Sequence, residues 1–211
     1  MDSYKITVNA FDMQAQAYQD KFMDLDLYDD TYNVFCDLIT PPNAEIFEIG
    51  CGPGNITKYL LSKNPNYRIT AIDLAPNMIK LAKENNPTAN CMVMDSRSID
   101  TITQKFDAII CGFCMPYLSK TDCEKMFADC ALLLNANGIF YFSLIEGNYS
   151  KSGYETNSKG EHPSYVYYHE ENYLVQYLND NAMEVVHTNR KYYTKHDGVV
   201  STHLIIIAKK Q

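Results

Sequence analysis

Short apolar runs alternate with amphipathic stretches through the middle of the chain. Five runs have the length and the β-branched or aromatic content of buried strands, at 45–49, 68–73, 89–95, 107–111 and 138–145. Between them, apolar positions recur at helical spacing over 56–62, 76–85 and 122–134, and the last begins with a capping-box pattern, Thr121-Asp122-Cys123-Glu124. This alternation predicts βαβ units around a parallel sheet that is buried on both faces.

The segments on either side of this region have different patterns. Upstream, two sets of residues at helical spacing predict two helices that end at Pro41-Pro42: Phe11, Ala15, Tyr18 and Phe22, then Leu27, Thr31, Val34 and Leu38. Downstream, the polar loop over 147–164 is long enough to be an active-site lid, and a helix is predicted at 169–181. Two β-rich runs, 184–194 and 199–208, flank His196-Asp197-Gly198, which is typical of a hairpin turn.

Length and composition are those of one globular unit. A chain of 211 residues suffices for one well-packed domain, and 46% hydrophobic and 21% charged residues are ordinary values. We therefore expect a single domain. Its parts are a helical cap over 1–41, a core over 42–146, a lid-like loop over 147–168, and a C-terminal helix and hairpin over 169–211.

Charge and cysteine usage narrow the functional classes. The formal net charge is −8, whereas proteins that hold nucleic acid or an anionic membrane usually present a basic face. No apolar run approaches the length of a membrane span, and the first residues lack the apolar core of a secretory signal. The seven cysteines are scattered through apolar segments. We therefore expect reduced thiols, a cytoplasmic protein and no membrane partner.

Two cysteine spacings raise the question of metal or redox chemistry. Cys111 and Cys114 have C-x-x-C spacing, but they follow a late strand, where a thioredoxin-like pair would open a helix after the first one. Cys123 and Cys130 lie seven positions apart on one face of a predicted helix, so they do not supply the second pair of a zinc site. We predict no metal site and expect these cysteines to be small buried hydrophobes.

The strongest local signal is a strand that runs into a glycine-rich turn, Glu48-Ile49-Gly50-Cys51-Gly52-Pro53-Gly54-Asn55. Glycine lets a ligand approach the backbone, and in an open α/β sheet this crevice is where ligands bind. A dinucleotide fingerprint would need a small residue at position 55, where Asn55 stands. Glu48 would repel a pyrophosphate but attract an ammonium and a sulfonium, which favours S-adenosylmethionine over NAD.

Two further acids follow later strands. Asp73 lies 23 positions after Gly50 (73 − 50), an offset suited to accepting hydrogen bonds from ribose hydroxyls. Asp95, followed by Ser96, can hold the exocyclic amine of an adenine while Met94 flanks the ring. Simpler interpretations stay open: Asp95 is also a good N-cap for a short helix at 97–99, and the glycines are also compatible with a tight turn alone.

Taken together, these segments resemble the class I S-adenosylmethionine-dependent methyltransferases. The resemblance rests on the glycine loop and on 71–78, 94–96, 106–110 and 132–140, in that order along the chain. It implies a Rossmann-like sheet of seven strands, mostly parallel with one antiparallel strand, with helices on both faces. It also implies transfer of a methyl group from S-adenosyl-L-methionine to a small-molecule acceptor, leaving S-adenosyl-L-homocysteine.

The resemblance further implies which residues hold the cofactor. Glu48 and the backbone at Gly50 and Gly52 would face its methionine part. Asp73 would take the ribose hydroxyls, and Asp95 would meet the adenine amine. The other implied contacts come from the neighbours of these residues, from the cap, and from the fourth strand near the donor methyl: Cys51, Gly54, Leu74, Met78, Ser96, Tyr18 and Cys111.

No spacing identifies a catalytic group. Methyl transfer is an in-line displacement that a protein can promote by alignment and by exclusion of water, and a base is needed only if the acceptor must lose a proton. His169, Glu146 and Tyr117 are candidates by position, although His169 is equally suited to begin a helix. We expect the acceptor to contact the cap, the 147–164 loop and the segment after Cys111. No motif indicates which molecule is the acceptor, which of its atoms is methylated, or the oligomeric state of the protein.

Other functions compete with this interpretation. Enzymes that methylate amino groups of nucleic acids carry Asn or Asp, Pro, Pro and an aromatic residue where this chain has 113–117, and only Pro116-Tyr117 fits. This mismatch and the acidic charge disfavour a nucleic-acid acceptor. A domain that binds the cofactor without catalysis, as a sensor or assembly subunit, stays open because the reaction needs no universal side chain. An NAD-dependent oxidoreductase is opposed by Asn55 and Glu48.

Overall fold

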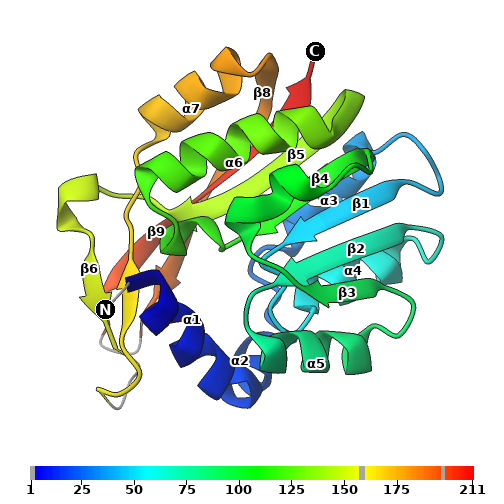
Figure 1. The fold of residues 1–211 in the computed structure, drawn as a ribbon. Coiled ribbons are helices and arrows are strands. Elements are labelled where there is room, and N and C mark those ends of the chain that lie inside the picture. The colour runs from blue at the N-terminus through cyan, green and yellow to red at the C-terminus, as the bar shows by residue number, and fades with distance from the viewer. Residues whose placement is uncertain (1–2, 157–159, 196–197) are drawn as a thin grey trace.

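The computed structural model describes residues 3–156, 160–195 and 198–211, and a seven-stranded sheet forms its centre (Figure 1). The strand order is β3-β2-β1-β4-β5-β9-β8. Every neighbouring pair is parallel except those made by β9, which runs antiparallel to both β5 and β8. The predicted fold class is confirmed. The strands are β1 (Glu45–Ile49), β2 (Arg68–Asp73), β3 (Asn90–Val93), β4 (Phe106–Gly112), β5 (Leu134–Ile145), β8 (Met183–Thr194) and β9 (Val200–Lys210).

Helices cover both faces of the sheet (Figure 1). Helices α3 (Asp29–Leu38), α4 (Asn55–Lys63) and α5 (Pro76–Asn85) share one apolar core with the sheet. Helices α6 (Lys120–Leu133) and α7 (Glu171–Asp180) and the 3₁₀-helix η1 (Ser96–Thr101) share the other. Because successive side chains of a strand point to opposite faces, Ile46 belongs to the first core and its neighbour Phe47 to the second.

The N-terminal region has three helices where the pattern predicts two. The first predicted helix is broken at Gln14, whose φ of −104° and ψ of 12° are not helical, into α1 (Ser3–Met13) and α2 (Ala15–Phe22). The Gln14 side-chain amide donates to the Ala10 carbonyl, 3.2 Å away. The sequence does not indicate this break, because position 14 is neither proline nor glycine and the apolar spacing continues across it. The second predicted helix is α3.

Helix α6 begins earlier than predicted, and its cap uses different residues. Ser119 accepts a hydrogen bond from the Asp122 backbone N–H and Asp122 accepts one from the Ser119 N–H, which completes a capping box; the predicted box at Thr121 and Glu124 is wrong. The Asp at the third helical position takes the part usually played by Glu or Gln.

This cap gives a first test. Ser119→Ala is expected to lower the free energy of unfolding by about 1 kcal/mol, because the Asp122 N–H loses its acceptor and the Asp122 carboxylate loses the Ser119 hydroxyl. Thr121→Ala, in the first turn of the same helix, is the matched control and should change it by only a few tenths. Urea titration followed by circular dichroism measures both. An equal loss in the two variants would contradict the assignment.

The segment after β5 is more ordered than the predicted loop. It holds a short 3₁₀-helix, η3 (Tyr149–Lys151), and an antiparallel pair, β6 (Gly153–Glu155) and β7 (Ser164–Val166). Helix α7 then starts at Glu171, two residues after the predicted start. The β8–β9 hairpin is confirmed by its antiparallel register, although His196 and Asp197 of the predicted turn lie outside the described residues. None of the described helices has the length and apolar character needed to cross a membrane.

Candidate functional site

The glycine turn after β1 depends on backbone conformations that favour glycine. Gly50, Gly52 and Gly54 have φ values of 69°, 53° and 83°. A Cβ atom on Gly50 would lie 2.6 Å from the Cβ of Cys114, so the segment that follows β4 packs directly on this turn. The turn therefore brings the ends of β1 and its neighbour β4, the central strand of the sheet, into contact at the crevice.

Glu48 lies beneath this turn. Its side chain is 1% exposed, accepts a hydrogen bond from the Thr57 hydroxyl through Oε2, and has a buried Oε1 with no hydrogen-bond partner among the described residues. Burial raises the pKa of this carboxyl to about 8, although the Thr57 bond opposes the shift. An unpaired buried acceptor is costly, so a cationic group brought to the turn would fit this carboxylate.

Asp73 fixes the next part of the crevice. Its Oδ2 accepts from the Gly52 N–H and its Oδ1 from the Ala75 N–H, both at 2.9 Å. Burial raises the pKa of Asp73, while these backbone N–H groups oppose the rise. The carboxylate thus ties the glycine turn to the end of β2 and, at the same time, lies in the wall of a cavity.

We call this cavity the donor cavity. It has a volume of about 90 Å³ and lies between the glycine turn, the end of β2, α1 and the segment after β4. Of the residues predicted to bind the cofactor, seven line it: Tyr18, Gly50, Gly52, Asp73, Leu74, Met78 and Ser96. Glu48, Cys51 and Gly54 do not line this cavity.

Asp95 lies at the edge of the donor cavity and is already hydrogen-bonded. It caps η1 by accepting from the Arg97 N–H at 2.9 Å and forms an ion pair with the Arg97 guanidinium at 2.8 Å. Burial raises its pKa, but the bonds from Arg97 outweigh this, so the pKa of Asp95 lies below its usual value. The N-cap interpretation is confirmed, and the side chain also borders a shallow pocket beside Leu74.

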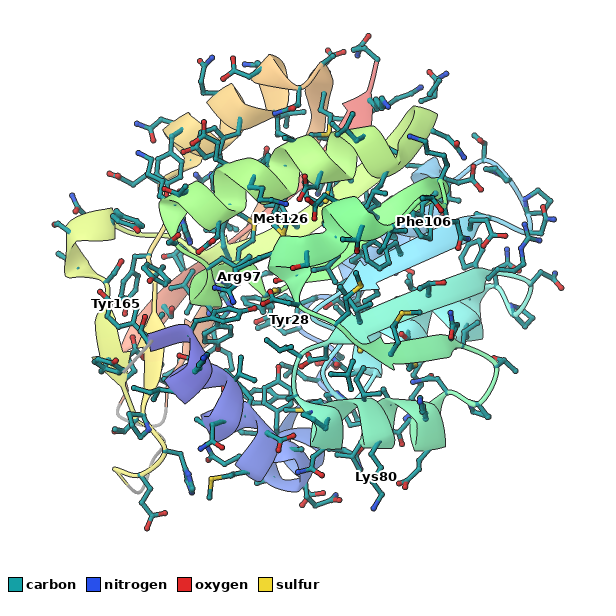
Figure 2. The ribbon with its side chains drawn as sticks, in the orientation of Figure 1. Tyr28, Lys80, Arg97, Phe106, Met126 and Tyr165 are labelled. Carbon is teal, nitrogen blue, oxygen red and sulfur yellow. The ribbon has the colours of Figure 1, made fainter. Side chains whose placement is uncertain are left out.

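Helix α1 closes the crevice from the N-terminal side. The Tyr4 hydroxyl lies 3.2 Å from Asp95 Oδ1, and the Arg97 guanidinium lies 3.6 Å from the centre of the Tyr4 ring. One turn later, Thr7 Oγ1 accepts from the Tyr165 N–H at 2.8 Å. In Figure 2, Arg97 and Tyr165 lie on either side of the start of α1. The helix therefore joins the η1 edge of the crevice to the β6–β7 pair.

Cys111 does not line the donor cavity. It is fully buried in the core beneath α6, with its Sγ 3.9 Å from the Met126 Sδ. Side chains alternate along β4, so the residue that turns toward α6 cannot also face the crevice. The wall at this place is formed by Gly112, Phe113 and Cys114.

A second, larger cavity adjoins the first, and we call it the acceptor cavity. Its volume is about 930 Å³, and Phe11, Tyr18, Gly50, Gly52 and Phe113 are among the residues that line both cavities. The cap, the 147–164 loop and the segment after Cys111 all contribute to its wall. The β8–β9 hairpin and the start of α3 also contribute, through Tyr193, Lys195, His203, Tyr28 and Tyr32. No motif in the sequence marks Lys195 or His203 as part of this wall.

Comparisons with known proteins identify the family. A family model described as a methyltransferase domain matches residues 46–138. The malonyl-[acyl-carrier protein] O-methyltransferase of Acetivibrio thermocellus is 38% identical over 78 residues, 35% of this chain and 26% of that protein. The trans-aconitate 2-methyltransferase of Streptomyces avermitilis is 38% identical over 72 residues, 32% of this chain and 27% of that protein. The matches thus span about a quarter of each relative.

A solved structure matches over the whole length. The crystal structure of magnesium protoporphyrin IX methyltransferase from Synechocystis PCC 6803 with bound S-adenosylmethionine has a TM-score of 0.73 at 15% identity, covering 100% of this chain and 98% of that chain. Residues 46–138 are a class I S-adenosylmethionine-dependent methyltransferase domain. The predicted family is confirmed, and with it S-adenosylmethionine as the cofactor of that family.

Two of the three candidate catalytic residues, His169 and Glu146, make contacts that stabilise the fold. His169 is fully buried, with Nδ1 2.6 Å from the Tyr173 hydroxyl and Nε2 3.0 Å from the Met115 carbonyl. Burial lowers the pKa of His169, which favours the uncharged form of the ring. Glu146 forms an ion pair with Arg190 at 2.6 Å. Neither residue is among those that line the two cavities.

Tyr117, the third candidate, lies where the sequence places it. Its ring lines both cavities and contacts Phe11, with centroids 4.7 Å apart. Burial raises the pKa of the Tyr117 phenol well above its usual value, so the hydroxyl is protonated at neutral pH. This side chain can donate a hydrogen bond at the junction of the cavities, but it is poorly suited to accept a proton.

Proposed function

We propose that the chain is an enzyme that transfers the methyl group of S-adenosylmethionine to a small molecule held in the acceptor cavity. The observation that carries this proposal is the junction of the two cavities. The smaller one lies on the glycine turn of the methyltransferase domain, and the larger one shares its wall with it at Tyr18, Phe113 and Tyr117. A reaction between two ligands needs such a shared boundary, because the donor carbon and the acceptor atom must meet in line without water.

The donor cavity suggests how the cofactor would be held. Its methionine part would lie on the backbone of Gly50 and Gly52, above the Glu48 carboxyl. Asp73 would take the ribose hydroxyls, with Leu74 and Met78 packed against the adenine. The site combines a glycine backbone with buried carboxylates, which suits a ligand that carries ammonium and sulfonium charges. Bound there, the cofactor supplies an electrophilic methyl group, and the chain contributes alignment.

The nature of the acceptor is supported by three observations. The named relatives act on malonyl-[acyl-carrier protein] and trans-aconitate. The acceptor cavity is partly enclosed by the helical cap and the β6–β7 pair, and the net charge of −8 disfavours nucleic acid. We further propose that cap, core, β6–β7 segment and C-terminal hairpin act as one domain, since all four contribute to this cavity. The seven unbridged cysteines agree with a cytoplasmic location.

Calorimetric titration with S-adenosylmethionine, S-adenosylhomocysteine and NAD tests the donor site. We expect micromolar binding of the two adenosyl ligands alone. Asp73→Ala should weaken it about tenfold, since the ribose loses a charged hydrogen-bond partner and the turn loses its tie to β2. Glu45→Ala removes an acid at the opposite end of β1 and is the matched control. Tight NAD binding, or no binding of any of the three ligands, would overturn the proposal.

A turnover assay separates the enzyme from a binding-only domain. Release of S-adenosylhomocysteine that depends on an added acceptor, and that falls in Asp73→Ala, is the expected result. Tight cofactor binding without turnover over a wide panel of hydroxyl, amine and carboxylate acceptors would favour a sensor or assembly subunit. A single substitution cannot make this distinction, because an enzyme that works by alignment has no one side chain on which turnover depends.

A further inference from the structure

The acceptor cavity contains a histidine that the mechanism of donor binding does not use. His203 lies on β9, is 7% exposed, and lines the cavity. Its Nδ1 lies 2.7 Å from the Tyr28 hydroxyl, while Nε2 makes no hydrogen bond within the described residues. The ring stacks on Tyr193 with centroids 5.4 Å apart and meets the edge of Phe113 at 4.7 Å. The imidazole is therefore held on three sides with one nitrogen left for a ligand.

This imidazole is uncharged at neutral pH. Burial lowers the pKa of His203 to about 4, and the positive charge of Lys195 contributes in the same direction. A neutral imidazole carries one donor and one acceptor nitrogen, and Tyr28 occupies one of them. A hydroxyl group both donates and accepts, so it can pair with Nε2 in either tautomer. A carboxylate lacks a donor, and the neutral ring offers it no charge.

The surroundings of His203 select for flat apolar groups. Aromatic side chains line the cavity on several sides, from the cap, from α3, from the segment after β4 and from β8: Phe11, Tyr18, Phe22, Tyr28, Tyr32, Phe113, Tyr117 and Tyr193. Such rings pack edge-to-face or offset against another aromatic ring, with a contribution beyond the area that they bury. Of the lining cations, Lys195 is paired with Glu155 at 2.8 Å and Lys21 lies over the Phe22 ring.

Phe113 places His203 beside the donor cavity. The Phe113 ring lines both cavities and contacts both His203 and Tyr28, whose ring centroid is 5.0 Å away. Its backbone has a φ of 56°, which is rare for a bulky residue, and its N–H donates to the Ser143 hydroxyl at 3.0 Å. A group bonded to His203 is thus separated from the donor side by a single, firmly held ring.

We propose that the acceptor cavity binds a hydroxylated aromatic molecule and that His203, oriented by Tyr28, recognises its hydroxyl group. This inference rests on the proposed function, because it takes the larger cavity as the acceptor site. The inference goes beyond the proposed function by naming a class of acceptor and two residues that select this class. His203 is the acceptor-binding group here, and Tyr28, which orients the His203 ring, is a positioning residue.

Binding of 2-naphthol to the protein saturated with S-adenosylhomocysteine provides the test. The chain contains no tryptophan, so the fluorescence of the probe can be followed directly. We expect His203→Phe, which keeps an aromatic ring but loses the nitrogen, to weaken binding about tenfold, as loss of one hydrogen bond implies. His203→Gln, which restores a donor and an acceptor, should recover most of the affinity. Tyr28→Phe should weaken it severalfold, and 2-naphthoate should bind less well than 2-naphthol.

His187→Phe is the matched control, because this histidine lies on neighbouring β8 and does not line the cavity. It should leave 2-naphthol binding unchanged. Unchanged affinity in both His203→Phe and Tyr28→Phe, or a preference for 2-naphthoate, would overturn the inference. Calorimetry with S-adenosylhomocysteine alone keeps the two proposals apart. Failure of that ligand to bind would overturn the proposed function, whereas normal binding with unselective naphthol binding would overturn only the acceptor class.

Discussion

Gly50→Ala is expected to weaken S-adenosylmethionine binding on the order of hundredfold, about 3 kcal/mol. The backbone at Gly50 has a φ of 69°, which costs alanine about 1 kcal/mol. The added methyl group would also lie 2.6 Å from the Cβ of Cys114, so the segment after β4 must move away from the turn. Both residues line the donor cavity, and the movement would displace the surface on which the cofactor lies. Calorimetric titration measures the loss.

Two further variants separate the clash from general instability. Gly50→Ala combined with Cys114→Gly removes the colliding Cβ but keeps the unfavourable φ, so part of the affinity should return. Gly153→Ala adds a methyl group where no heavy atom lies within 4 Å, and it should bind the cofactor normally. Wild-type affinity in Gly50→Ala would show that the glycine turn is not the donor site.

Glu48→Gln is expected to stabilise the free protein at pH 8 by on the order of 3 kcal/mol. The pKa of Glu48 is about 8 in the folded protein, well above the model-peptide value of 4.5. A carboxyl raised in this way favours folding fully below the lower value, and that contribution is lost as the pH rises through the upper one. The wild type should therefore lose stability between about pH 4.5 and 8, and glutamine, which cannot ionise, should abolish this part of the pH dependence. Urea titrations at several pH values measure it.

Glu48→Gln is expected to have the opposite effect on cofactor binding from its effect on stability. A cationic cofactor favours the ionised carboxylate, so binding at pH 7 should release a proton from the wild type and none from Glu48→Gln. Calorimetry in buffers of different ionisation enthalpy detects the proton. The variant should also bind the cofactor more weakly although it is the more stable protein. Equal pH dependence of stability in both proteins would contradict the raised pKa.

Features set by neighbouring residues were predictable from the sequence. The bounds of β1, β2 and α5 coincide with the predicted ones, because Gly50, Asp73 and Pro76 mark where these elements meet the crevice. The positions of the glycine turn and of Asp73 at the crevice were predictable for the same reason, since they follow from backbone geometry near the end of a strand.

Features set by tertiary contact were not predictable. Gln14 interrupts a continuous apolar stripe, and Ser119 rather than Thr121 caps α6 although both are good caps. Cys111 was placed on the crevice side of β4, but a shift of one residue along a strand reverses the face. Tyr28 and His203 are 175 positions apart, and no local pattern connects them.

The position of β9 sets an order of assembly. Strands β1 to β5 can pair with one another as they leave the ribosome, whereas β8 reaches the sheet only through β9, which is synthesised after it. The glycine turn and Asp73 belong to the early part, while Tyr193 and His203 belong to the late hairpin. A nascent chain therefore completes the proposed donor site first, and the proposed acceptor site only when β9 pairs between β5 and β8.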